Sequence, residues 1–291
     1  MAKQTTRFLS KDLAKRYASK AVLYLILILG AVVAILPFYW MVSTSFMTLS
    51  ETINRKWFPA ELQFQNYVDA WNQAKFAKYF LNSVIITFTT VVGVLFTSTL
   101  AGYAFARIRF AGRDFLFALM LSTMMIPETI TLLPNLLMIR GAIIPLPGGS
   151  WVNTLQGLAV PFMANAFSVF LLRQFFAQVP NELWDAARID GCGHLRFLIQ
   201  VVLPISKAPM MTVLLFSFTS AWNAFMWPLL VTTRENWRPL MVGLWNFVTE
   251  AGPETHLLMA GAVITLIPIL IVYFFAQKQF TEGIATTGLK G

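Results

Sequence analysis

Six long stretches of this chain carry almost no charge, and they constrain its fold more than any other feature. Five are charge-free, and the sixth is interrupted only by Glu128; they cover residues 21–50, 79–106, 115–139, 141–172, 208–233 and 255–277. Each is longer than the ~20 residues that a helix needs to cross a ~30 Å hydrocarbon core. Charged residues make up 12% of the chain, against about 25% in soluble domains. We therefore expect an all-α integral membrane protein with six transmembrane helices.

The basic residues predict the orientation of these helices. Six spans place both termini on one side of the membrane, together with 15 of the 22 basic and six of the 13 acidic residues. Lys and Arg are retained on the cytoplasmic side, so both termini are expected there. The net charge of +9 is explained by this orientation, and no nucleic acid partner is needed to account for it.

The predicted layout is a cytoplasmic segment 1–20, a membrane domain 21–279 with a cytoplasmic loop 178–207, and a tail 280–291. The first apolar run is too long for the h-region of a cleaved signal peptide, so we expect it to remain as a helix. Cys192 is the only cysteine, which leaves neither a disulfide nor a thiolate metal site. The glycines before Ser150 lack the Lys-Ser or Lys-Thr of a P-loop. We expect no catalytic residues, no metal and no cofactor on this chain.

The stretch NELWDAARIDGCGHLRFLIQVVLP, residues 181–204, is a charged insert between the fourth and fifth apolar runs. Pro180 suits a helix start, Asn181 is a candidate cap, and Glu182 and Asp185 complement the dipole of the first turn. Gly191 fits the end of this helix, and a second helix is expected from 194 to 203. Such a bent pair could dock a partner protein or lie against the membrane, and its residues alone leave both interpretations open.

The insert resembles a known motif. ELWDAARIDGCG followed by VVLP is similar to the EAA loop of permease subunits in binding-protein-dependent ABC importers, with Leu203 and Pro204 at the motif's distance from Gly191. Two positions depart from the usual pattern, because Asp185 stands where Glu is common and Cys192 where Ala is common. The ending QKQFTEGIATTGLKG resembles the carbohydrate-uptake branch of the family.

The resemblance implies a type I ABC importer permease in the plasma membrane of a bacterium or archaeon. Its implied partners are a second permease, a cytoplasmic ATPase dimer that holds ATP and Mg, an extracytoplasmic substrate-binding protein and membrane lipid. The implied substrate is a sugar, a polyol or a glycerol phosphate, and the chain itself is no enzyme. The residues implied to couple to the ATPase are Glu182, Asp185, Ala186, Ala187, Asp190 and Gly191, with weaker tail candidates at Gly288, Lys290 and Gly291.

Two places in the apolar runs are candidates for the substrate path. Glu128 follows Pro127 within the third run, where a charge costs roughly 2.5–3.5 kcal/mol, so it is expected to face the bundle interior. It could serve substrate or gating, or be a paired structural carboxylate. In the fifth run, Trp222 and Trp227 could stack on sugar rings, and Asn223 could bond hydroxyls. An aromatic belt is the alternative for Trp227. The amides of Asn82, Asn135 and Asn165 are weaker candidates.

A proton-coupled secondary transporter, with Glu128 as the proton site, is the alternative function. It is disfavoured because such carriers are commonly built from internal repeats with paired broken helices, and the sequence shows none. A membrane enzyme is a third possibility, and it lacks a catalytic cluster.

Overall fold

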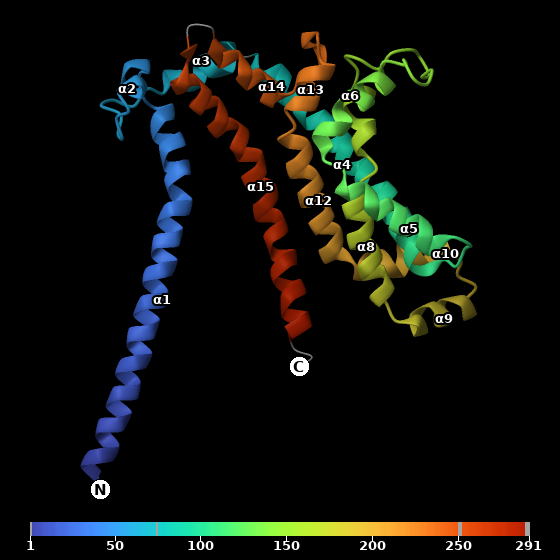
Figure 1. Ribbon diagram of the computed structural model, residues 1–291, viewed down its shortest axis with the longest axis horizontal. Coiled ribbons are helices and arrows are strands. Elements are labelled where there is room, and N and C mark those ends of the chain that lie inside the picture. The colour runs from blue at the N-terminus through green and yellow to red at the C-terminus, as the bar shows by residue number, and fades with distance from the viewer. Residues whose placement is uncertain (1, 74, 250–251, 289–291) are drawn as a thin grey trace. The chain divides into compact units, whose positions relative to one another are not determined.

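The computed structural model describes the backbone of residues 2–73, 75–249 and 252–288, most of it helical (Figure 1). Side chains are described between residues 17 and 277, except at 18, 74 and 249–251. The chain divides into two compact units, residues 1–70 with 247–264 and residues 71–246 with 265–291. Each unit is described by itself.

The first unit joins a long helix to a short extramembrane layer. Its elements are α1 (Ala2–Ser45), α2 (Leu49–Ile53), most of α3 (Gln65–Gln73), the paired strands β1 (Val248–Thr249) and β2 (Gly252–Pro253), and the start of α15 (Thr255–Gly288). The end of α1 is tied to α3 by Asn66, whose Nδ2 donates to the carbonyls of Ser45 at 2.9 Å and Met47 at 2.8 Å. Since Asn66 is buried, these bonds satisfy backbone groups that water does not reach.

The second unit contains most of the remaining helices. In chain order they are α4 (Phe76–Arg107), α5 (Arg113–Ser122), η1 (Thr123–Met125), α6 (Glu128–Ile139), α7 (Leu155–Ala159), η2 (Val160–Phe162), α8 (Ala166–Gln178), α9 (Asn181–Ile189), α10 (His194–Phe197), the π-helical η3 (Leu198–Val202), α11 (Leu203–Ile205), α12 (Lys207–Trp222), α13 (Met226–Val231), η4 (Glu235–Trp237), α14 (Leu240–Leu244) and η5 (Trp245–Phe247), the last of which ends at the unit boundary.

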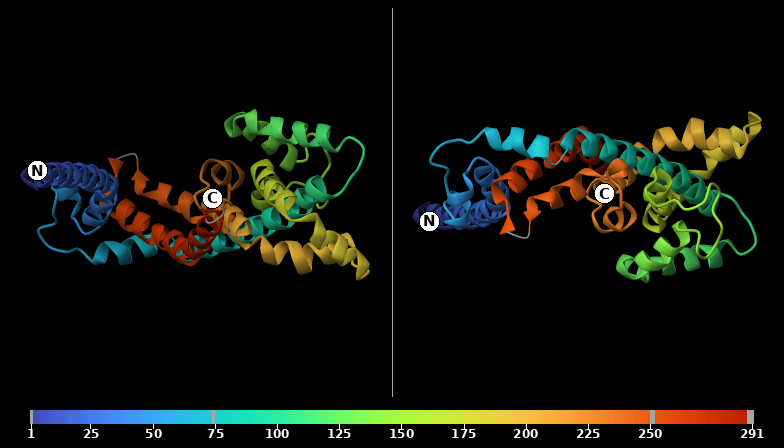
Figure 2. Two further views of the ribbon diagram at one scale, coloured as in Figure 1. Left: turned by 90° about the horizontal axis from the view of Figure 1, so that it is seen from below. Right: turned by 90° about the horizontal axis from the view of Figure 1, so that it is seen from above.

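Helix α4 is the centre of the second unit and packs against α8 and α12 (Figures 1 and 2). Its buried residues recur every three or four positions, at Tyr79, Ser83, Ile86, Thr90 and onward to Tyr103, so they form one continuous face. Gly102 lies on this face, where an added Cβ would meet the Leu172 Cβ at 3.1 Å and the Arg173 backbone nitrogen at 3.2 Å. The helices α4 and α8 therefore approach closely because this position has no side chain.

The six expected spans correspond to three single helices and three bent pairs within the described residues. The single helices cover Ser19–Ser45, Phe76–Arg107 and Thr255–Gln277. The third expected span is a bent pair, in which Arg113–Met125 and Glu128–Ile139 meet at 105° on either side of Pro127. Proline restricts the preceding residue to extended backbone, and Ile126 has ψ 118°, so the helix stops there.

The fourth and fifth expected spans also differ from their charge-free runs. The fourth run begins at Gly141, yet residues 141–154 form a loop and the helix begins at Leu155, bending by 45° before Ala166. The fifth is interrupted at residues 223–225, between α12 and α13. The helical stretch His194–Ile205 and α12 meet at 84°. The absence of charge therefore predicts which segments are apolar more accurately than it predicts where their helices begin and end.

Candidate functional site

The insert forms two helices separated by a glycine, as the sequence predicts. The first, α9, begins directly after Pro180, which has extended backbone. The prediction that Asn181 caps this helix is wrong, because no side chain caps its start. The Asn181 Oδ1 instead accepts a hydrogen bond of 2.7 Å from Arg107 Nη1, and Arg107 Nη2 donates to the Val179 carbonyl. An arginine from the end of α4 thus holds the segment that leads into α9.

The end of α9 is a Schellman motif centred on Gly191. The Gly191 nitrogen donates to the Arg188 carbonyl at 3.0 Å, and the Cys192 nitrogen donates to the Ala187 carbonyl at 2.8 Å, the two bonds that define this ending. Gly191 has φ +75°, a left-handed conformation that glycine adopts without steric cost. The prediction that Gly191 ends the helix is confirmed.

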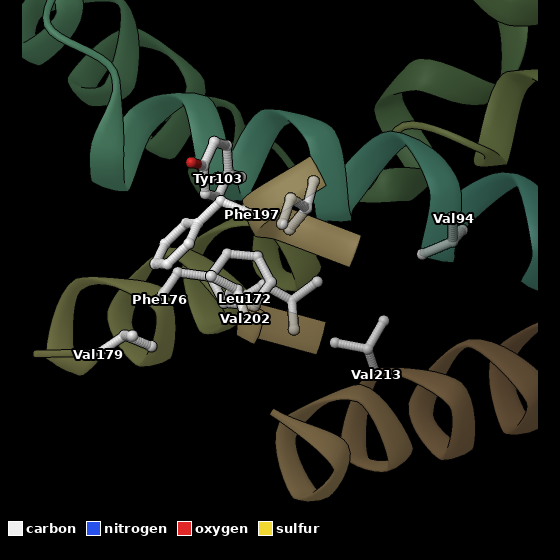
Figure 3. Close-up of a cluster of buried hydrophobic side chains, with 9 residues drawn as sticks. Val94, Tyr103, Leu172, Phe176, Val179, Phe197, Val202 and Val213 are labelled. Atoms are coloured by element: carbon white, nitrogen blue, oxygen red, sulfur yellow. The ribbon is translucent and has the colours of Figure 1, made fainter. Parts of the chain in front are cut away.

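An apolar cluster fixes the insert to the transmembrane helices (Figure 3). Phe197 from α10 is fully buried among Tyr103 of α4 and Leu172 and Phe176 of α8. Burying a side chain of this size contributes on the order of 2 kcal/mol. Trp184 of α9 packs at the border of the cluster, edge-on to Phe197 with ring centroids 5.0 Å apart. The insert is therefore part of the folded core and not a loose loop.

The predicted coupling residues divide into an outer face and an anchor. Glu182, Asp185, Ala186, Asp190 and Gly191 are exposed. Ala187 is half-buried and packs against the apolar cluster, so its small side chain lets α9 seat on the core. The exposed face combines carboxylates with a small residue, which a basic partner surface can approach closely. Gly288 lies in α15 without a described side chain, and Lys290 and Gly291 lie outside the described residues.

Glu128 occupies the sharp bend between η1 and α6. It is the first residue of α6, and its side chain is exposed in this single chain. The expectation that it faces the interior of this chain's own bundle is therefore wrong. Glu128 lies directly after Pro127, where the two helices meet at 105°.

The two tryptophans of the fifth run are structural. Trp222 is 2% exposed and its Nε1 donates to the Thr265 carbonyl at 3.1 Å, while Trp227 is 3% exposed and its Nε1 donates to the Gly157 carbonyl at 3.0 Å. The prediction that they stack on substrate does not hold for rings buried in this way. Asn223 is different, because it is exposed at the break that follows α12, and among the residues that the structure describes its amide and its backbone nitrogen donate to the Thr219 carbonyl in its own helix.

Two of the three weaker amide candidates also have structural roles. Asn82 is buried and donates to the carbonyls of Asn236 and Arg238, each at 2.9 Å. Asn165 caps α8 by accepting from the Ser168 nitrogen at 2.8 Å. Asn135 is half-buried beside an apolar hollow that Trp151 also lines.

The roles of three residues in the site, Tyr103, Arg107 and His194, were missed from the sequence. Arg107 and Tyr103 lie at the end of α4, and the Tyr103 hydroxyl lies 2.9 Å from His194 Nδ1. Their partners are 72 to 91 residues away in sequence, so no local pattern connects them.

Proteins similar to this chain are membrane permeases. The diacetylchitobiose uptake system permease protein of Streptomyces coelicolor is 30% identical over 276 residues, which cover 93% of this chain and 88% of that protein. The arabinooligosaccharides transport system permease protein of Bacillus subtilis is 30% identical and covers 80% of this chain and 81% of its own length. The sn-glycerol-3-phosphate transport system permease protein of Yersinia pestis is 30% identical, and the alignment covers 90% of this chain and 94% of that protein.

A solved structure shares the fold. A chain of a bacterial ABC transporter involved in the import of the acidic polysaccharide alginate aligns with a TM-score of 0.75 and 24% identity, over 88% of this chain and 94% of that chain. Residues 93–285, which include α9 and both bent pairs on either side of it, match the family of binding-protein-dependent transport system inner membrane components. Together with the relatives of full length, this match shows that the chain belongs to that family and is a permease subunit of an ABC importer.

Proposed function

We propose that this chain forms, with a second permease, the membrane path of an ATP-driven importer for a sugar or a related polyol or glycerol phosphate. In this proposal α9 is the coupling helix and docks on a cytoplasmic ATPase dimer. Both chain termini then lie in the cytoplasm, and an extracytoplasmic binding protein delivers the substrate. ATP and Mg are held by the ATPase subunits, and no finding supports the proton-coupled alternative built on Glu128.

The observation that carries the proposal is the exposed face of α9 on a firmly anchored insert. Its carboxylates at 182, 185 and 190 are exposed, while Trp184 and Ala187 pack on the core. A helix held in this way can transmit force, because a push on its outer face moves the helices beneath it. The outer side of α9 also carries Leu183 at 40% and Ile189 at 87% exposed, and docking on a partner protein would cover these apolar side chains together with the carboxylates.

The exposure of Glu128 and Asn223 supports a second permease beside this chain. A carboxylate facing lipid is costly, so the surface at the bend before α6 is expected to be covered by protein or to line a polar path. Apolar residues near the same bend are also strongly exposed, with Met125 at 84% and Ile130 at 65%. A path between two permeases would place Glu128 and Asn223 within reach of a hydroxyl-rich substrate.

The relatives support the substrate class. Their names specify diacetylchitobiose, arabinooligosaccharides and sn-glycerol 3-phosphate, all of which carry free hydroxyl groups. Asn223 has an exposed amide that can bond such groups as donor and acceptor. A substrate of this class fits a polar path better than an apolar one.

The test is purification of the chain with its genomic neighbours, followed by uptake into proteoliposomes. Copurification of an ATPase that is lost in the double variant Glu182→Lys, Asp185→Lys, together with ATP-dependent uptake of one labelled compound from a panel of these three substrates and simple sugars, would support the proposal. Glu61→Lys is a matched control, because Glu61 is exposed in the extramembrane part of the first unit. Retention of the ATPase by the double variant, or uptake driven by a proton gradient without ATP, would contradict it.

A further inference from the structure

We propose that Tyr103 and Arg107 form a two-point latch by which α4 holds the segment leading into α9 and, through His194 beyond its end, follows its displacement. The proposal deepens the function proposed above and rests on it, since it concerns how motion at the ATPase reaches the membrane. Neither residue belongs to the insert or to its motif. Both are positioning residues, because they act through α9 and the segments beside it.

The first point of the latch holds the start of α9. Two nitrogens of the Arg107 guanidinium donate to neighbouring acceptors, Nη1 to Asn181 Oδ1 at 2.7 Å and Nη2 to the Val179 carbonyl. A planar guanidinium can hold two acceptors in one fixed geometry, which a lysine ammonium on a flexible stem does less well. These bonds also involve a charged donor, and such bonds are stronger than neutral ones.

The second point holds the segment just after α9. The Tyr103 hydroxyl and His194 Nδ1 are 2.9 Å apart, and the His194 ring stacks on Trp184 of α9 with centroids 4.4 Å apart and planes 15° from parallel. Tyr103 is only 3% exposed, so its ring is immobilised in the apolar cluster. The contact therefore runs from α4 through His194 to the middle of α9.

Two points transmit motion better than one. A single contact would leave α9 free to pivot about it, whereas a second contact, made through His194 to Trp184, restrains its direction relative to α4. Tyr103 and Arg107 are four positions apart, so they project from the same face of α4, one turn from each other. Because α4 is a single helix of 32 residues, a displacement of its end is carried along the second span.

The experiment measures how far the binding protein stimulates ATP hydrolysis by the complete complex in lipid nanodiscs. This stimulation factor measures coupling per assembled complex, so a loss of folded protein alone leaves it unchanged. We expect Tyr103→Phe to lower the factor about fivefold, the size expected for one lost hydrogen bond, and Arg107→Met to lower it further, because it removes two hydrogen bonds. Arg107→Lys should restore part of it. Tyr273→Phe and Arg109→Met are matched controls at exposed positions and should retain the factor.

A double-mutant cycle tests the second point independently. His194→Phe removes the same hydrogen bond from the exposed partner and keeps a ring to stack on Trp184, so it tests the bond even if Tyr103→Phe prevents assembly. The stimulation factor of the double variant, Tyr103→Phe with His194→Phe, should fall no further than that of either single variant, since all three lack the same hydrogen bond.

An unchanged stimulation factor in Arg107→Met and His194→Phe, or equal losses in the controls, would overturn the latch. That failure differs from failure of the proposed function, in which the ATPase would not copurify with the wild-type chain at all.

Discussion

Gly191 determines how α9 ends, because its left-handed backbone places two donors on the last carbonyls of the helix. We expect Gly191→Pro to abolish transport and ATPase coupling, since proline fixes φ near −65° and removes the N–H that bonds the Arg188 carbonyl. Gly191→Asn should retain most transport, because asparagine tolerates the left-handed region. Uptake by purified complexes, normalised to bound ATPase, distinguishes the two. Full uptake by Gly191→Pro would refute this role.

Glu51 is the residue for which the structure gives the clearest pH dependence. Hydrogen bonds from the Thr48 and Ala60 nitrogens, with smaller contributions from the Thr48 hydroxyl and Lys56, lower the pKa of this carboxyl, which lies in the first turn of α2, from 4.5 to about 2. Because the pKa is lower in the folded protein, the ionised Glu51 carboxylate stabilises the start of α2 fully at pH values above its pKa in the unfolded chain, 4.5. That stabilisation is lost as the pH falls from 4.5 toward 2.

Hydrogen exchange of the Thr48 and Ala60 amides, corrected for the intrinsic rate, measures this effect. We expect protection at pH 6 and progressive loss of protection below pH 4.5. Glu51→Gln should show reduced protection already at pH 6, because the neutral amide is a weaker acceptor, whereas Glu61→Gln should not. Protection that stays constant down to pH 2.5 would contradict the assignment.

Single residues were predictable where the backbone alone sets the requirement. Gly191 and Pro180 could be placed from the sequence because a helix end needs them whatever packs nearby. Asn181 was assigned to a cap because local rules favour it, but a charged donor 74 residues earlier competes for its oxygen. Trp222 and Trp227 were assigned to substrate because burial and exposure of an indole ring look alike in sequence.

At the scale of elements, the close approach of α4 and α8 depends on Gly102. Gly102→Val would place a Cβ 3.1 Å from the Leu172 Cβ and 3.2 Å from the backbone nitrogen of Arg173. Since backbone cannot move aside as a flexible side chain can, we expect a loss of about 1–3 kcal/mol in stability. Thermal unfolding of the detergent-solubilised chain measures it.

Gly30→Val is the control for this substitution. Gly30 also lies in an apolar helix, and an added Cβ there meets nothing within 4 Å. The control should unfold close to the wild-type temperature. Equal unfolding temperatures for the two variants would show that the contact between α4 and α8 yields without cost.

Elements could be predicted as apolar segments more accurately than as helices. The first, second and sixth spans match their charge-free runs within a few residues. The other three belong to bent pairs: the bends of the third and fourth lie inside their apolar runs, whereas that of the fifth lies at Ser206, just before its run begins. Such bends leave the number of charged residues in a run unchanged, so hydropathy does not reveal them. They nevertheless decide where Glu128 lies, because it directly follows one.

At the scale of the whole molecule, the proposed function requires a second permease beside this chain to complete the transport path. Glu128 and Asn223 are both exposed in the single chain, and in hydrocarbon an isolated carboxylate would be costly. The layout of six spans could be predicted from hydropathy, and the family from one motif. The exposure of Glu128 and Asn223 could not be predicted, because it depends on breaks in the helices that the charge pattern does not reveal.

The proposed orientation predicts which side of the membrane each loop reaches, and the single native cysteine makes the test direct. Cys192 is half-exposed beside Gly191, so a membrane-impermeant maleimide should label it in inside-out vesicles and not in intact spheroplasts. Phe58 is 71% exposed in the loop after the first span, and Phe58→Cys in a Cys192→Ser background should show the opposite pattern.

The two sites are separated by three predicted spans, an odd number, so they must lie on opposite sides if the topology is correct. Labelling of both sites from the same side would reject the topology, and with it the docking of α9 on a cytoplasmic ATPase.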